Sequence, residues 1–195
     1  MGRWGRSIAH GACVVSALAV ATPGVTETPL TFGFYGDVGL IDMPTANMAN
    51  DGLLTSTFSS FDGTVRATLS FQVTPRLSGS FRYTTIDEFS GVGTDRTYDR
   101  SFDVSYQVVT ETERRPAIAI GLRDFIGTGS LTSEYVVATK TLTPKLTASI
   151  GLGWGRFGSF NGFENPLGVI ESGFETRPPR DPDRGGEVEA DQWFR

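Results

Sequence analysis

Residues 64–73 read TVRATLSFQV, and apolar side chains alternate along them with polar ones. Successive side chains of an extended chain point to opposite faces, so this alternation separates an apolar face from a polar one. The apolar face holds Val65, Ala67, Leu69, Phe71 and Val73, and the polar face holds Thr64, Arg66, Thr68, Ser70 and Gln72. The stretch therefore predicts a β-strand with one apolar face.

The same alternation recurs through the chain, as in residues 102–108 (FDVSYQV) and 146–154 (LTASIGLGW). It predicts seven strands, at about residues 53–61, 64–73, 77–85, 99–109, 116–124, 133–142 and 146–155. Strands of this length cross a bilayer when tilted, and their small or polar second face suits the interior of a barrel. Seven strands leave two unpaired edges, which hydrocarbon does not tolerate. We expect an all-β fold, an antiparallel up-and-down transmembrane β-barrel segment that is part of a larger barrel. A soluble periplasmic β-sandwich, which alternates in the same way, remains the alternative.

The N-terminus has the layout of a cleaved secretory signal peptide, over residues 1–21. Arg3 and Arg6 precede an apolar run from about residue 12 to 20, which ends in Ala19-Val20-Ala21. Cys13 lies at the start of the apolar run, whereas a lipid-modified cysteine follows it, so we expect no lipid on Cys13.

Loss of residues 1–21 removes His10 and Cys13, which are the single histidine and the single cysteine of the sequence. The remaining chain has no residues for thiolate catalysis, disulfides, Cys/His zinc sites or histidine-based triads. We expect no cofactor and no metal. Without Arg3 and Arg6, 15 basic residues face 22 acidic ones. This acidic balance excludes a nucleic-acid partner.

The connections between strands predict which end of the barrel faces the periplasm. The turns at residues 74–76 (TPR) and 143–145 (TPK) are short, whereas residues 86–98 and 156–190 are long and polar. Outer-membrane barrels have short periplasmic turns and long external loops. We expect a turn-rich segment at 22–52, the strands at 53–155, a polar loop at 156–190 and the start of another strand at 191–195. An aromatic girdle near the external strand ends would comprise Phe61, Tyr83, Tyr98, Phe125, Tyr135, Trp154 and Phe157.

The stretch GLRDFIGTGSLTSEY, residues 121–135, contains a glycine pair and three charged residues. A phosphate-binding loop needs a helix after the glycines, but the residues from 133 onward alternate as a strand. Gly127 and Gly129 therefore predict a turn. We expect Arg123, Asp124 and Glu134 to form a network inside the barrel, with a polysaccharide contact and catalysis as alternatives.

Several motifs together resemble the YjbH family, which is related to the GfcD proteins of capsule operons. They are YGDVGLIDMPTANM (35–48), YDRSFDVSYQ (98–107), GLRDFIGTGSLTSEYVVATK (121–140), GLGWGRFG (151–158) and DQWFR (191–195). The N-terminal motif, with Gly36, Gly39, Asp42 and Pro44, would form a plug, an entry clip or an ordinary connector.

The resemblance implies a Gram-negative outer-membrane barrel with a structural or translocation role in exopolysaccharide or capsule export. Because the chain without its signal peptide lacks histidine, we also expect no enzyme activity. Its partners would be outer-membrane lipid, polysaccharide and other export proteins. Family members are longer, so this chain is similar to their N-terminal part. A periplasmic polysaccharide-binding sandwich is the second reading of function, and a carboxylate-based glycan hydrolase or lyase is the third.

Overall fold

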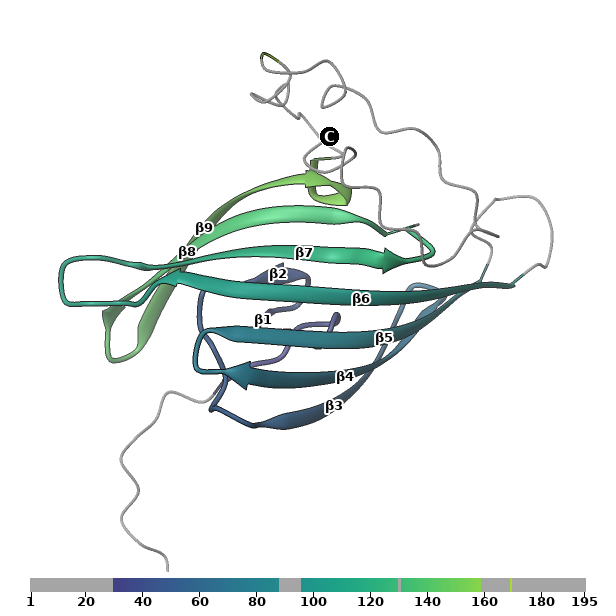
Figure 1. Cartoon of the computed structure of the whole chain (residues 1–195), viewed down its shortest axis with the longest axis horizontal. Helices are drawn as coiled ribbons and strands as arrows, with labels where there is room; N and C mark the ends of the chain where they lie inside the picture. The colour runs from purple at the N-terminus through teal and green to yellow at the C-terminus, as the bar shows by residue number, and fades with distance from the viewer. Residues whose placement is uncertain (1–29, 88–95, 130, 159–168, 170–195) are drawn as a thin grey trace, which may run out of the picture.

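The computed structural model describes residues 30–87, 96–129, 131–158 and 169, and in these residues the protein is all-β. Seven strands form one antiparallel sheet in chain order (Figure 1). They are β3 (Leu54–Phe61), β4 (Thr64–Thr74), β5 (Leu77–Asp87), β6 (Arg96–Val109), β7 (Ala117–Gly127), β8 (Ser133–Thr143) and β9 (Leu146–Gly155). A separate hairpin pairs β1 (Gly39–Leu40) with β2 (Met43–Pro44), and a 3-10 turn, η1, spans Arg156–Gly158. In this part of the chain, no helix has the length and apolar character needed to cross a membrane.

All seven predicted strands are confirmed, and the largest differences lie at the ends of β6 and β7. β6 starts at Arg96, three residues earlier than predicted, because Arg96 pairs with Asp87 in register and through an ion pair of 2.8 Å. β7 runs on to Gly127 because the β6–β7 ladder resumes after an irregularity, pairing Phe102 with Ile126. The alternation ends before this second stretch of pairing, so it could not predict it.

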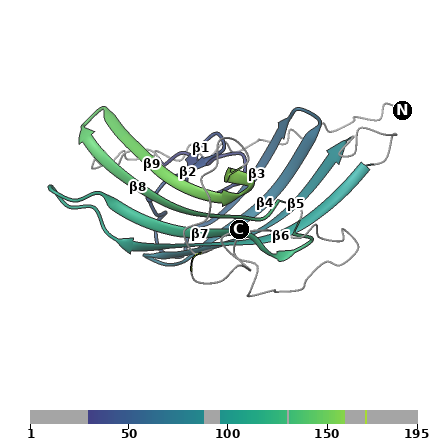
Figure 2. The ribbon, with the colours of Figure 1, turned by 90° about the horizontal axis from the view of Figure 1, so that it is seen from above.

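The sheet curves into a half-barrel (Figure 2). Its two faces differ in polarity. Apolar side chains are exposed on the convex face, among them Phe58 at 79% and Ile150 at 76%. Polar residues are buried on the concave face, including Thr68, Arg82, Thr84, Asp99, Ser101 and Thr139. This is the reverse of a soluble protein, in which apolar side chains fill the interior.

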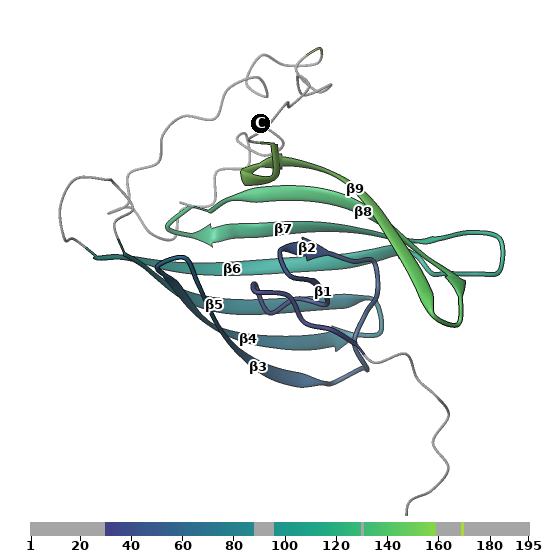
Figure 3. The same ribbon diagram turned by 180° about the vertical axis from the view of Figure 1, so that it is seen from behind.

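Residues 30–52, called here the N-terminal segment, include the β1–β2 hairpin and lie on the concave side of the sheet (Figures 2 and 3). A small apolar core forms where this segment meets β7 and β8. Its buried members are Ala46, Ala117, Ala119, Tyr135 and Val137. The segment therefore occupies the hollow of the half-barrel.

Tyr135 corrects part of the predicted aromatic girdle. It is only 5% exposed, whereas Phe61, Tyr83 and Tyr98 are 63%, 38% and 51% exposed. Tyr135 pairs in register with Gly121, and its ring covers the place where a Cβ of Gly121 would be. The missing side chain at residue 121 lets the ring lie inward against the neighbouring strand.

The short connections lie at one end of the sheet, where residues 75–76, 110–116 and 144–145 join successive strands. The turns at residues 62–63 and 128–132 lie at the other end. The predicted signal peptide, the final strand start at 191–195, and nearly all of the predicted loop at 156–190 lie outside the described residues.

Candidate functional site

The centre of the concave face is an aromatic ring surrounded by three arginines. Tyr35 of the N-terminal segment is 1% exposed. The guanidinium carbons of Arg66, Arg82 and Arg123 lie 4.7, 4.4 and 4.2 Å from the centre of its ring. These arginines come from the polar faces of β4, β5 and β7. A ring face attracts cations at such distances, so Tyr35 offsets part of the repulsion among the three. We call Arg66, Arg82 and Arg123 the arginine cluster.

Two carboxylates pair with this cluster, one from the segment and one from the sheet. Nη2 of Arg123 lies 2.5 Å from Oδ2 of Asp37. Arg82 binds Asp103 of β6 through two nitrogens, at 2.5 and 3.1 Å. Arg82 and Arg123 are 0% and 3% exposed. Burial makes such pairs costly to break, because a lone buried charge is left behind.

Side chains of the sheet also bind the backbone of the segment. Arg82 and Arg123 reach the carbonyl oxygens of Tyr35 and Asp42. Further bonds run from Ser59 Oγ to the Phe34 carbonyl (2.8 Å), from Ser70 Oγ to the Gly36 carbonyl (2.6 Å), from Gln107 Nε2 to the Ala46 carbonyl (2.7 Å), and from the Ala46 N–H to Thr139 Oγ1 (2.8 Å). The polar concave face thus satisfies backbone groups that strands would otherwise have to pair.

The residues of the YGDVGLIDMP motif allow this close fit. Gly36 has a φ of +79°, and a Cβ on it would lie 2.6 Å from side-chain atoms of Thr57 and Thr68. Gly39 pairs with Pro44 in the β1–β2 hairpin. Asp42 contributes its backbone carbonyl, and its side chain is exposed.

Asp124 organises the turn between β7 and β8. Its φ is +52°, and its N–H donates to Oδ1 of Asp103 at 2.8 Å. Its carboxylate accepts the N–H groups of Gly129 and Leu131 at 3.3 and 2.9 Å. Gly127 ends β7, and Gly129 has a φ of +72°. The strand β8 follows these glycines, as the alternation from residue 133 onward predicted.

The expected network of Arg123, Asp124 and Glu134 needs correction. Arg123 pairs with Asp37, and Asp124 binds the turn. Glu134 pairs in register with Leu122 and Trp154, which places it on the face opposite Arg123. Sequence reasoning grouped the three because they are neighbours in the chain, and it missed Asp37 and Asp103. One pattern in the sequence could have indicated the arginine cluster. The strands β4, β5 and β7 each carry a single arginine on the face that is otherwise small or polar.

A second ion pair lies at the end of the sheet that carries the short connections. Glu111 accepts a hydrogen bond from Nζ of Lys140 at 2.7 Å and one from the N–H of Thr141 at 2.9 Å. The bond from Lys140 lowers the pKa of Glu111 below its ordinary value, and the bonds from Thr141 act in the same direction. This pair ties residues 110–116 to β8.

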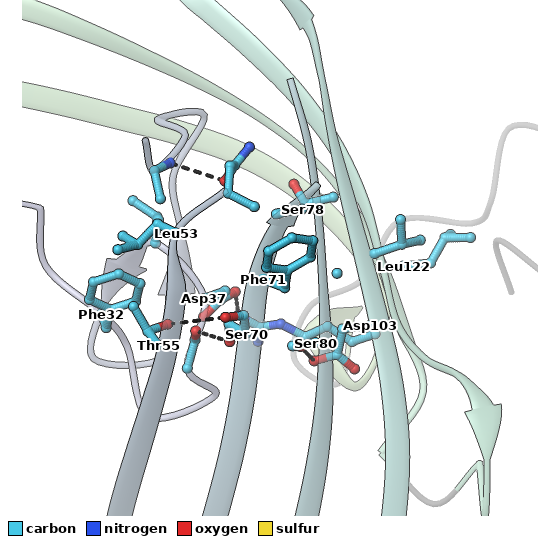
Figure 4. A pocket seen from close by; sticks show the side chains of 18 of the residues that line it. Phe32, Asp37, Leu53, Thr55, Ser70, Phe71, Ser78, Ser80, Asp103 and Leu122 are labelled. Atoms are coloured by element: carbon cyan, nitrogen blue, oxygen red, sulfur yellow. Dashed lines mark hydrogen bonds and ion pairs between the residues drawn. The ribbon is translucent and has the colours of Figure 1, made fainter. Parts of the chain in front are cut away.

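Two hollows flank the N-terminal segment. A cavity of about 40 Å³ lies beside Asp37 and Arg123. Its lining combines apolar side chains such as Phe32, Leu53 and Phe71 with the polar residues Thr55, Ser70, Ser78 and Ser80 (Figure 4). A groove of about 800 Å³ lies between the segment and β9, with Asn47, Thr141, Thr147 and Ser149 in its lining. Over the described ranges, no three His, Cys, Asp or Glu residues gather in a way that could hold a metal ion.

Comparison with known proteins identifies the family. Residues 31–195 match the model of a family described as "Exopolysaccharide biosynthesis protein YbjH" and named YjbH. The chain belongs to the YjbH family. It is 36% identical over 165 residues to a protein of Escherichia coli (strain K12) called "Uncharacterized lipoprotein YjbH". The match covers 77% of this chain and 23% of the relative, so the chain spans about a quarter of that relative's length. No solved structure matches the chain. The resemblance drawn from the motifs is therefore confirmed.

Proposed function

We propose that this chain forms part of an outer-membrane β-barrel that serves exopolysaccharide or capsule export as a structural or translocation component, without enzyme activity. The observation that carries the proposal is the polarity of the half-barrel. Large apolar side chains such as Phe58, Leu69, Ile150 and Leu152 are exposed on one face, whereas Arg66, Arg82, Asp99 and Arg123 are buried on the other. Glu134 is also buried, but it lies on the apolar face. Lipid is the surrounding medium that stabilises such an arrangement.

The family description supports the exopolysaccharide part of the proposal, because the match covers residues 31–195. The relative's name, a lipoprotein, supports an exported protein associated with a membrane. Lipid on this chain would have to be attached to Cys13, which lies at the start of the apolar run. We therefore propose that export here uses a cleaved signal peptide and that strands hold the protein in the membrane.

The half-barrel also favours the proposal over its two rivals. A sandwich buries the apolar faces of two sheets against each other. The described strands form one large sheet, whose apolar face is exposed and whose polar face is covered. A glycan hydrolase needs a free carboxylic acid near a carboxylate. Asp124, one of the two carboxylates considered for such chemistry, already accepts hydrogen bonds from two backbone N–H groups of its turn.

Fractionation of the producing cell tests the proposal. We expect the protein to stay with outer membranes after alkaline carbonate washing and to migrate faster in unheated than in heated gel samples. We expect deletion of the gene to reduce surface polysaccharide while the polymer is still synthesised. Release of the intact protein by carbonate, with unchanged surface polysaccharide, would exclude this function.

A further inference from the structure

The arginine cluster holds more positive charge than its partners within the sheet account for. Arg82 pairs with Asp103 of β6, but the carboxylate on Arg123 comes from the N-terminal segment. Arg66 is 6% exposed, and its Nε has no hydrogen-bond partner among the described residues. Guanidinium groups pair with carboxylates in a planar, two-bond geometry. Asp99 of β6 is also buried on this face and interacts electrostatically with Arg82 and Arg66. The wall of the half-barrel thus presents three arginines against two nearby carboxylates of the sheet, and of these only Asp103 forms a close ion pair.

The N-terminal segment can leave this wall without breaking the sheet. Between residues 31–49 and the sheet, every hydrogen bond that the structure describes uses a side chain on at least one side. The β1–β2 hairpin forms a sheet of its own. Movement of the segment would therefore expose the cluster and leave the β3–β9 ladder intact.

The surroundings of Asp37 suit a sugar. Its pair with Arg123 borders the 40 Å³ cavity, whose lining combines apolar side chains such as Phe32 and Phe71 with serines and threonines, a mixture that can contact both the ring faces and the hydroxyl groups of a glycan (Figure 4). A water molecule takes up about 30 Å³ in the liquid, so the cavity cannot admit a sugar ring in this structure. A sugar could enter only after Tyr35 and Asp37 had moved away.

We infer that Arg66, Arg82 and Arg123 form a binding site for the carboxylate groups of an acidic polysaccharide, and that Asp37 occupies this site in the absence of polymer. The inference rests on the proposed function for the choice of a polysaccharide as ligand. The segment acts as a tethered competitor, whose carboxylate is held near the cluster at high effective concentration. A polymer that carries many carboxylates displaces it.

Titration of the whole chain in detergent micelles with a hexamer of galacturonic acid tests the inference. Asp37→Asn removes the competing charge, so we expect at least about fivefold tighter binding than in the unaltered protein. Asp51→Asn, an exposed change in the same segment, should leave affinity unchanged. Arg66→Gln should weaken binding about tenfold, and because Arg66 has no ion pair among the described residues, this change breaks no ion pair.

Three results would overturn the inference. They are equal affinity of the Asp37→Asn and unaltered proteins, equal affinity for a neutral hexamer of glucose, and tighter binding of hexaglutamate than of the galacturonate hexamer. Each variant is first checked for the faster migration of unheated samples. If Arg66→Gln fails that check, Arg66→Lys keeps the charge but loses the planar group, and it should still weaken binding. The titration does not depend on where the protein resides, so its failure is separate from a failure of fractionation.

Discussion

Gly36 shows at the scale of one residue how a motif can be explained by packing. Its positive φ and its closeness to Thr57 and Thr68 leave room for a hydrogen atom only. Gly52 also has a positive φ, of +73°, but a Cβ added to it would meet no atom within 4 Å. A side chain at Gly52 would therefore meet backbone strain alone, whereas one at Gly36 would meet backbone strain and a steric clash.

We predict that Gly36→Ala destabilises the protein more than Gly52→Ala. A left-handed conformation costs an alanine about 1–2 kcal/mol at either position. Overpacking adds about 1–3 kcal/mol at Gly36 alone. Denaturant unfolding in detergent measures the difference, and limited proteolysis should cut residues 30–52 faster in Gly36→Ala. Equal midpoints for the two variants would show that the segment does not pack closely on β3 and β4.

Tyr35 gives a second residue-scale prediction, because its ring and its hydroxyl have different surroundings. The ring contacts three guanidinium groups, whereas the buried hydroxyl has no hydrogen-bond partner among the described residues. Tyr35→Phe should be nearly neutral, since it keeps the ring. Tyr35→Leu should cost about 1.5–6 kcal/mol of unfolding free energy, since it removes three cation–π contacts that contribute about 0.5–2 kcal/mol each. Unfolding curves of the two variants measure this, and an equally large loss in Tyr35→Phe would contradict it.

Single residues also mark the limit of what the sequence could predict about the site. Alternation placed Arg66 on a polar face, and the motif singled out the stretch that contains Tyr35. No local pattern relates Tyr35 to Arg123, because 88 positions separate them in the chain. The contact depends on where the N-terminal segment lies within the half-barrel. Tyr135 was misplaced for a similar reason, since its inward position depends on Gly121 of the neighbouring strand.

At the scale of elements, strands and turns were predictable because their signals are local. The period of two identified β3 to β9, and the glycines identified the β7–β8 turn. Asp124 was misassigned because its positive φ and its bonds to Gly129 and Leu131 make it part of the turn.

We predict that Asp124→Asn destabilises this turn and that Asp124→Ala does so more. Asparagine tolerates a positive φ but offers one acceptor oxygen where the carboxylate offers two. A buried N–H left without a partner costs about 1–3 kcal/mol. Alanine leaves two such groups and adds backbone strain. The fraction of protein that migrates faster without heating should fall in the order unaltered, Asn, Ala. Full folding of Asp124→Ala would show that the carboxylate does not stabilise the turn.

The Glu111–Lys140 pair gives a prediction for pH at the opposite end of the sheet. Because folding lowers the pKa of Glu111, the pair stabilises the folded state above the unfolded pKa. This stability is lost as the pH falls through the lowered folded value, which lies below the ordinary value of 4.5. The protection of the Thr141 amide against hydrogen exchange, relative to the intrinsic rate at the same pH, should therefore fall on acidification into that range, and Glu111→Gln should remove this pH dependence. Identical pH profiles for the two proteins would contradict the assignment.

At the scale of the whole molecule, alternation alone left a barrel and a sandwich open, because both have strands with one apolar face. The structure adds the curvature of a single sheet and the position of the N-terminal segment on its concave side (Figure 2). From the sequence, the charged residues of the polar face belonged to an interior only if the strands formed a barrel, and no local pattern showed that the N-terminal segment covers them. The polarity of the two faces therefore distinguishes a barrel from a sandwich only once the curvature of the sheet is known.

Two adjacent residues of β9 test which medium surrounds the convex face. Ile150 and Ser149 are both exposed, and they point to opposite faces of the same strand. If the convex face contacts lipid, Ile150→Arg costs about 2–4 kcal/mol near the bilayer centre. Ser149→Arg places the same side chain on the concave face and loses one hydroxyl contact with Thr139, of 2.9 Å. We expect Ile150→Arg to remove the folded protein from outer membranes, and Ser149→Arg to retain most of it. A water-exposed convex face would tolerate both changes, so equal amounts of the two variants in the membrane fraction would exclude the barrel.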